Sequence, residues 1–132
     1  MKTLEELKAY CLQHAGAKED YPFGHEPLVM KVGGKMFAII SESSGSNESG
    51  GANRTTTESA HASISLKCEP HMAELLRMQY EAVAPGYHLN KKHWNTVQAN
   101  GSVPDSELQE MIDHSYDLIV KSLTKKQRAE MF

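Results

Sequence analysis

This sequence of 132 residues is poor in several residue types, and each shortage excludes a class of protein. Its two cysteines, Cys11 and Cys68, are far apart and form no CxxC pair, so a disulfide scaffold is not expected. No stretch approaches the roughly 18 consecutive apolar residues that a membrane span needs. The charged N-terminus lacks the apolar core of a signal peptide. We therefore expect a cytoplasmic protein, with reduced thiols and no membrane association.

Signatures of common catalytic and cofactor sites are also missing. The sequence contains no GxSxG, Walker A or GxGxxG motif, and its seven histidines have no zinc-type spacing. His88 and His93 would meet across a turn, but without a third ligand. Cys68 alternates inward with Ile64 and Leu66, which predicts a buried, inert thiol. The sequence thus predicts no metal, no cofactor and no catalytic residue, and favours a binding protein over an enzyme.

Length and composition predict a single domain, 1–132, with one interruption. A chain of this length with 39% hydrophobic residues supports one modest core. The segment 42–62 is rich in Ser, Gly, Asn and Thr and has no aromatic residue. It lies between two good strands, so we expect a flexible polar insertion that adds little to the core.

Hydrophobic periodicity places the regular elements. Helices are expected at 3–15, 70–80 and 104–123, and strands at 28–32, 35–41, 63–68, 86–89 and 92–99. Gly33-Gly34 predicts a hairpin turn between the first two strands. In the second of these, alternation puts Phe37 and Ile39 on one face, and Met36, Ala38 and Ile40 on the other.

The helices carry two further expectations. The apolar stripe of the 70–80 helix is expected to be buried and consists of Met72, Leu75, Leu76 and Tyr80. Lys121, Lys125 and Lys126 are assigned to the C-terminal end of the last helix, where they complement its dipole. Helices do not alternate regularly with strands, so a doubly wound parallel sheet is excluded. The prediction is an α+β two-layer sandwich, an antiparallel sheet with helices packed on one face.

The segment Pro85–Val97 is the candidate functional stretch. The chain has a net charge of −3, yet it carries no acid between Glu81 and Asp105, and this stretch contains a Lys-Lys pair and the only tryptophan. Strand alternation places Trp94 among polar neighbours, with Lys67 on a wet strand face of the same sheet. The candidate nucleic-acid-binding or ligand-binding residues are Lys67, Tyr87, His88, Asn90, Lys91, Lys92, His93 and Trp94.

Three interpretations of these residues remain open. The lysines would hold phosphates while Trp94 stacks on a base, which describes a DNA-binding sheet face. Alternatively, the segment forms a polar pocket for a small anionic ligand, in a binding protein or an enzyme, or it contacts a protein partner. The third interpretation is structural: Trp94 packs under a loop, Asn90 caps the turn and the lysines are only solvated.

Several motifs resemble those of one family of small bacterial proteins. Lys67-Cys68-Glu69-Pro70 and Pro85-Gly86-Tyr87-His88-Leu89-Asn90-Lys91-Lys92-His93-Trp94 resemble the signature of the MmcQ/YjbR family. Tyr21-Pro22-Phe23-Gly24 and Gly33-Gly34-Lys35-Met36-Phe37 resemble its N-terminal half. The resemblance implies a CyaY-like fold, related in architecture to frataxin, and a DNA-binding role. Frataxin-like iron binding does not carry over, because the first helix has only Glu5 and Glu6 and no acidic ridge.

Overall fold

The computed structural model describes residues 2–21, 27–42, 61–86 and 89–131. Its helices are α1 (Leu4–Leu12), α2 (Pro70–Gln79), α3 (Asp105–Ser122) and α4 (Lys125–Met131). Its strands are β1 (Lys18–Asp20), β2 (Leu28–Val32), β3 (Lys35–Glu42), β4 (Ala62–Lys67), β5 (Val83–Pro85) and β6 (Trp94–Gln98). None of the helices described is long and apolar enough to cross a membrane.

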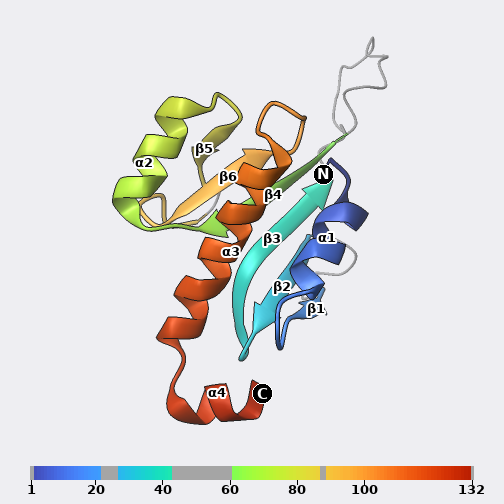
Figure 1. Cartoon of the computed structure of the whole chain (residues 1–132), viewed down its shortest axis with the longest axis vertical. Coiled ribbons are helices and arrows are strands. Elements are labelled where there is room, and N and C mark those ends of the chain that lie inside the picture. Colours follow the sequence, from blue (N-terminus) through green and yellow to red (C-terminus); the bar gives the residue numbers. More distant parts are fainter. Residues whose placement is uncertain (1, 22–26, 43–60, 87–88, 132) are drawn as a thin grey trace.

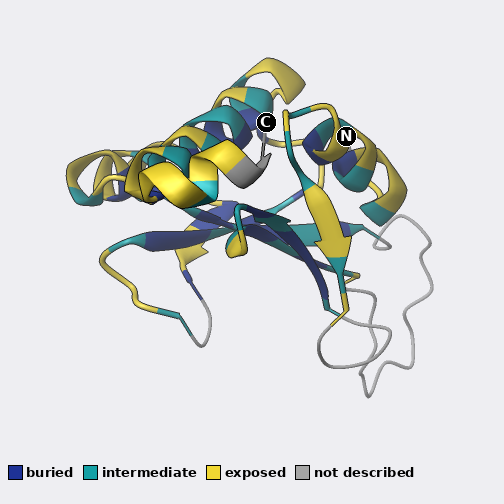
Figure 2. Cartoon of the chain, turned by 90° about the horizontal axis from the view of Figure 1, so that it is seen from below, coloured by how far each residue is buried: buried dark blue, intermediate teal, exposed yellow. Residues whose placement is uncertain are grey.

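The six strands form one sheet in the order β1-β2-β3-β4-β6-β5, and every neighbouring pair is antiparallel. The helices lie on one side of this sheet (Figures 1 and 2). The predicted α+β two-layer architecture is therefore confirmed. The core lies between the layers, where side chains of the central strands meet α1 and α3; its largest fully buried members include Leu7, Leu28, Met30, Phe37, Ile40, Ile64, Leu108 and Ile112.

Strand β3 contains a β-bulge that overturns part of the predicted alternation. Its register with β2 passes from Met30↔Ala38 to Lys31↔Met36, which leaves Phe37 as an extra residue. Phe37 consequently joins Ala38 on the helix side, where its ring meets that of Tyr116 edge-on at 5.4 Å. The prediction that Phe37 shares a face with Ile39 is therefore wrong, because alternation holds only while each residue has one partner.

Ser115 of α3 joins the helix layer to the sheet beside this bulge. Its side chain is fully buried; the hydroxyl donates to the Phe37 carbonyl at 2.6 Å and accepts from the Lys67 backbone N–H at 2.9 Å. The last β3–β4 register pair is Ala38↔Leu66, so Phe37 and Lys67 would face each other at the next step. The serine hydroxyl thus bridges two backbone groups that the ladder would otherwise join directly.

A short helix that the sequence did not predict follows the expected long one at the chain end. Helix α3 stops at Ser122, and Thr124 starts α4 with a reciprocal cap: its side chain accepts from the Gln127 N–H, and its own N–H donates to the Gln127 side chain. Lys125 and Lys126 therefore begin α4 rather than end α3. They still lie near the C-terminal end of α3, as expected, and the helix predicted at 104–123 is confirmed to within one residue at each end.

Leu123, between these two helices, packs on the β2–β3 turn. It is buried, and a Cβ added at Gly33 would lie 2.6 Å from its Cδ1. Gly33 also has a φ of +60°, which side chains disfavour. Glycine at this turn therefore satisfies both the hairpin geometry and the close approach of the chain end.

The predicted hairpin at 86–99 is shifted toward the N-terminus. Its first described strand is β5 at Val83–Pro85, with Pro85 opposite Asn95; Gly86 and Leu89 of the predicted strand 86–89 are not in a strand, and Tyr87 and His88 lie outside the described residues. The predicted polar insertion has its ends next to each other, since Glu42 is the register partner of Ala62. Residues 43–60 themselves lie outside the described ranges.

Replacing Ser115 with alanine tests the hydroxyl bridge. The variant leaves a half-buried N–H and a buried carbonyl without their partner, so we expect a loss of about 1–3 kcal/mol in the free energy of unfolding. Urea denaturation measures this loss. Ser106→Ala, at an exposed position of the same helix, is the matched control, and equal stability of the two variants would contradict the bridge.

Replacing residues 43–61 with Asn-Gly tests whether the polar insertion is dispensable. Glu42 and Ala62 already pair, so a two-residue turn fits between them. Shortening a surface loop changes its closure entropy by only about 0.6 kcal/mol per halving of length. The shortened protein should keep the melting temperature of the full chain within a few degrees, as followed by circular dichroism. A molten or insoluble product would show that the segment contributes to folding.

Candidate functional site

The face of the sheet opposite the helices has no described helix over it (Figure 2). Strand register places its side chains in rows that cross the sheet. One row runs through Val29, Ile39, Ser65, Thr96 and Ala84. A second row runs through Ser41, Ser63 and Gln98. A band of small polar side chains therefore lies between apolar ones.

These rows form the floor of a cavity of about 940 Å³, which we call the open-face trough. One side is apolar and comes from β2 and β3, and the far wall is the segment that follows β5. The described lining residues are Pro27, Val29, Lys31, Met36, Ile39, Ser41, Ser63, Ser65, Ala84, Pro85, Leu89, Thr96 and Gln98. Sequence reasoning missed this site, although the serines that alternate with apolar residues in 63–68 marked the wet face of β4.

The described lining of the trough has little net charge. Lys31 is its only ionisable side chain, and it forms an ion pair with Asp20 at 2.8 Å. The hydroxyls of Ser65 and Thr96 hydrogen-bond to each other at 2.8 Å across β4 and β6. The trough thus offers apolar contact together with neutral hydrogen-bonding groups, and no aromatic side chain belongs to its described lining.

Trp94 lies on the same sheet face but is covered. It is 8% exposed, and it is the register partner of Lys67. A Cβ added at Gly86 would lie 2.8 Å from the Trp94 Cβ and 3.3 Å from the Leu89 Cβ, so the chain after β5 passes directly over the start of β6. This close cover matches the structural interpretation of Trp94, and a base has no exposed ring to stack on there.

Arg77 of α2 holds the segment around Trp94 in place. Its Nε donates to Asn95 Oδ1 at 2.7 Å, and its terminal nitrogen donates to the backbone carbonyl of Lys91. Asn95 is buried, and its Nδ2 donates back to the Ala73 carbonyl at 3.3 Å. This Arg77–Asn95 clamp was not expected from the sequence. The sequence pattern of a helix does not distinguish an arginine that binds another segment from one that is only solvated.

Among the other predicted site residues, the described ones do not converge on one pocket. Asn90 Oδ1 accepts from the Lys92 N–H at 2.9 Å, so it caps the turn, and Lys91 Nζ donates to the Gly86 carbonyl at 3.2 Å. His93 is half-buried, and its carbonyl accepts from the Cys68 N–H at 2.7 Å. Lys67, the two turn lysines and Trp94 are absent from the described trough lining. Tyr87 and His88 lie outside the described residues.

Both thiols are buried and unpaired, as predicted. Burial, and then the nearby charge of Glu69, raise the pKa of Cys68 to about 11. Burial likewise raises the pKa of Cys11 to about 12. Cys68 is therefore a neutral thiol at physiological pH and a poor nucleophile. Within the described ranges, no three His, Cys, Asp or Glu side chains are grouped to hold a metal ion.

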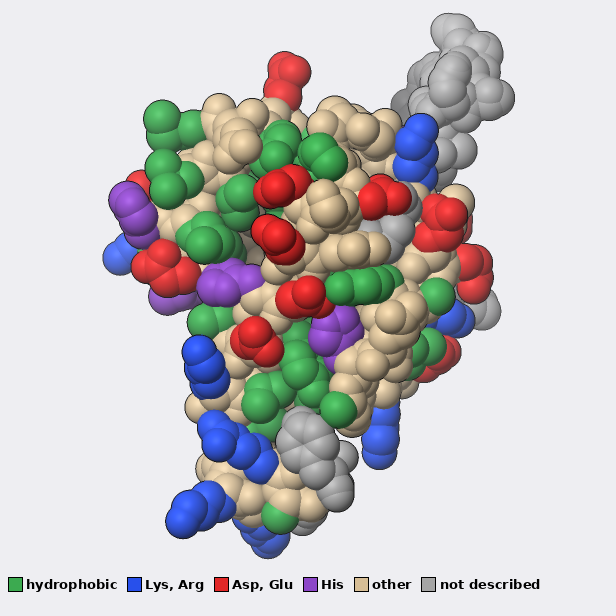
Figure 3. Space-filling model, viewed as in Figure 1, with side chains coloured by type: hydrophobic (Ala, Val, Ile, Leu, Met, Phe, Trp, Pro, Cys, Tyr) green, Lys and Arg blue, Asp and Glu red, His purple; other side chains and the backbone are tan. Residues whose placement is uncertain are grey.

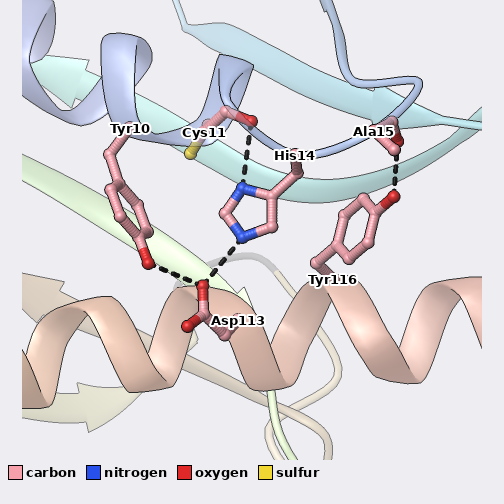
Figure 4. A network of polar contacts seen from close by, with 6 residues as sticks. All are labelled: Tyr10, Cys11, His14, Ala15, Asp113 and Tyr116. Atoms are coloured by element: carbon pink, nitrogen blue, oxygen red, sulfur yellow. Dashed lines mark hydrogen bonds and ion pairs between the residues drawn. The ribbon is translucent and has the colours of Figure 1, made fainter.

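A second polar cluster joins α1 to α3 (Figure 4). Asp113 Oδ1 accepts from the Tyr10 hydroxyl at 2.8 Å and contacts His14 Nε2 at 2.8 Å, while the Tyr116 hydroxyl donates to the Ala15 carbonyl. Burial, and then the hydrogen bond to Asp113, raise the pKa of Tyr10 to about 12, so its hydroxyl stays a donor. These contacts attach the first helix to the third.

Arg77→Met tests whether the clamp positions the Trp94 segment. The variant keeps an apolar stem but removes the charged donors from the Asn95 side chain and the Lys91 carbonyl. Hydrogen bonds to charged groups contribute about 1.5–3 kcal/mol, so we expect a destabilisation of that size. Trp94 emission should also shift to longer wavelength as its cover loosens. Arg128→Met on α4 is the control, and an unchanged Trp94 spectrum in Arg77→Met would contradict the positioning role.

Comparison with known proteins supports one family across most of the chain. The YjbR family model matches residues 12–118. The chain is 36% identical over 126 residues to the uncharacterized protein YjbR of Escherichia coli K12, covering 96% of this chain and 94% of that one. It is 33% identical over 122 residues to the uncharacterized protein YbdF of Escherichia coli O157:H7, covering 92% and 88%.

Solved structures agree with this family and with the fold. The crystal structure of the Deinococcus radiodurans protein DR2400, with the domain DUF419, matches with a TM-score of 0.78 and 36% identity, covering 99% of this chain and 88% of that one. A Pseudomonas syringae protein matches with a TM-score of 0.68 and 23% identity, covering 88% and 97%, and shows the fold alone. The family model and these relatives together establish that the chain belongs to the YjbR family.

Proposed function

We propose that this protein binds a small, mostly uncharged molecule in the open-face trough. The observation that carries the proposal is a cavity of about 940 Å³ on the sheet face opposite the helices. Ligand-binding clefts have volumes of about 300–1,000 Å³ and combine apolar walls with a few polar groups. The trough follows this pattern, with Ile39 and Met36 on one side and Leu89 on the other.

The chemistry of the lining supports an elongated ligand with a polar middle. The hydroxyls of Ser41, Ser63, Ser65 and Thr96 form a band between the two apolar sides. Hydroxyls both donate and accept, so a ligand hydroxyl, amide or carbonyl finds a partner there. Because Lys31 is neutralised by Asp20, the trough favours uncharged ligands over the anionic ligand expected from the sequence.

DNA binding through the same sheet face is the alternative function. Exposed Lys91 and Lys92 support it, since phosphates bind lysines. Three observations oppose it: the net charge is −3, Trp94 is buried, and the described lining of the trough has no aromatic side chain. Single-stranded nucleic acid needs exposed aromatic rings for stacking, so we prefer the small-molecule proposal.

Filling the trough tests the small-molecule proposal. Nile red, an uncharged apolar dye whose emission rises in apolar surroundings, serves as the probe. Ser65→Phe places a ring at the centre of the trough and should weaken dye binding about tenfold, because a filled pocket excludes the ligand. Ser106→Phe, exposed on α3, is the matched control and should bind dye like the wild type. Melting curves confirm that both variants fold.

The same variants separate this function from DNA binding. A labelled oligonucleotide is titrated by fluorescence anisotropy at two salt concentrations. We expect weak binding, equal in Ser65→Phe and the wild type. Tight binding that falls steeply with salt and is lost in the double variant Lys67→Ala, Lys92→Ala would favour the DNA-binding function. Equal dye binding by Ser65→Phe and wild type would reject the trough as the ligand site.

A further inference from the structure

A groove lies on the other side of the molecule, between α2 and α3. It has a volume of about 420 Å³. Its floor comes from β4 and β6, where Leu66 and Val97 belong to the protein core. Its walls are Met72, Leu75 and Leu76 on α2, and Met111 and His114 on α3. The two helices therefore leave a gap in the helix layer that reaches down to the sheet.

Helix α2 carries an apolar stripe that its own chain does not cover. Met72 and Leu75, which the sequence predicted to be buried, are 43% and 49% exposed, and Met78 is 83% exposed. Ala73 is the only residue of the helix classed as buried. The stripe prediction is wrong for Met72 and Leu75, because the Arg77–Asn95 clamp fixes α2 on the sheet with this side facing the groove and solvent.

The opposite wall of the groove is acidic. Glu107 and Glu110 of α3 line it, and the space-filling view shows acidic side chains gathered over this part of the molecule (Figure 3). Among the described lining residues, Lys67 is the only lysine or arginine, and its strand position directs its side chain to the other sheet face. An occupant of matching chemistry therefore has an apolar stripe with positive charges on the side that faces α3.

We propose that this groove binds an amphipathic helix of a partner protein, with Leu-type or Met-type anchors and flanking Lys or Arg residues. Helix-in-groove recognition uses anchors at i, i+3 or i+4, and i+7, which span about 10 Å of helix. Helix α2 has ten residues, or about 15 Å, so the wall is long enough. Methionine walls adapt their shape to the anchors. The bound helix fills the gap in the helix layer over β4 and β6.

The probe is a labelled helical peptide of about 15 residues, or four turns, with leucines on one face and lysines on the rest. A second peptide has glutamate in place of every lysine. Fluorescence anisotropy should show the lysine peptide binding the full chain with a micromolar dissociation constant. Charge complementarity predicts that the glutamate peptide binds at least about tenfold more weakly.

Two variants, each with a matched control variant, test whether the peptide binds in the groove. Leu75→Glu should weaken the lysine peptide about tenfold, whereas Leu12→Glu, on α1 and 40% exposed, should leave it unchanged. Reversing both acids, Glu107→Lys with Glu110→Lys, should exchange the peptide preference, while Glu5→Lys with Glu81→Lys should not. The substituted positions are exposed, apart from Glu107, which is half-buried. Melting curves check that every variant folds.

Other outcomes overturn the proposal. Equal effects of Leu75→Glu and Leu12→Glu, or equal binding of the two peptides, would mean that the peptide contacts the surface nonspecifically. No binding up to millimolar peptide would reject a helix as the occupant. Sedimentation that shows a dimer of the chain, abolished by Leu75→Glu, would assign the groove to a second copy instead of a partner protein.

Discussion

The buried hydroxyl of Ser115 fixes how the helix layer meets the sheet. It bridges the Lys67 N–H and the Phe37 carbonyl, and an unpaired buried group of this kind costs about 1–3 kcal/mol. This bridge therefore sets both the rotation of α3 and its position along the sheet. With that rotation, Asp113 reaches Tyr10 and His14 of the first helical region, while Glu107, Met111 and His114 line the groove beside α2.

The bulge at Phe37 links the two faces of the sheet. It moves the aromatic ring to the helix side, where the ring packs on Tyr116. It also leaves Met36, Ile39 and Ser41 as the side chains of β3 that face the trough. Because of this one extra residue, the Phe37 ring packs in the core and does not lie on the open face, where a ligand could stack on it. The absence of a β3 aromatic ring from the described lining of the trough follows from this register.

Periodicity and turn chemistry were enough to predict most elements and the layer architecture. The Gly33-Gly34 turn, the alternation in 63–68 and the stripe of α3 depend on local spacing, which the sequence contains. The failures share a different cause. The bulge at Phe37 and the cover over Trp94 each depend on a partner from another segment of the chain.

The candidate site was harder to predict than the fold for the same reason. Unusual residues around Trp94 drew attention, but their contacts are mainly structural: a turn cap at Asn90, a clamp from Arg77 and close packing at Gly86. The trough is made of ordinary serines, a threonine and aliphatic residues that become a site only when strand register aligns them. No single segment contains enough of these residues to mark the site in advance.

The strand order has a consequence for how the chain assembles during synthesis. Strands β1 to β4 pair with their neighbours in sequence order, so the sheet can grow strand by strand as the chain is made, and the contacts of the β2–β3 hairpin, which are local in sequence, form fast. Helix α3, which covers its central strands, is translated much later. Until Ser115 and Leu123 emerge from the ribosome, the apolar side of the nascent sheet has no cover from α3, and it is exposed to chaperones and to other nascent chains.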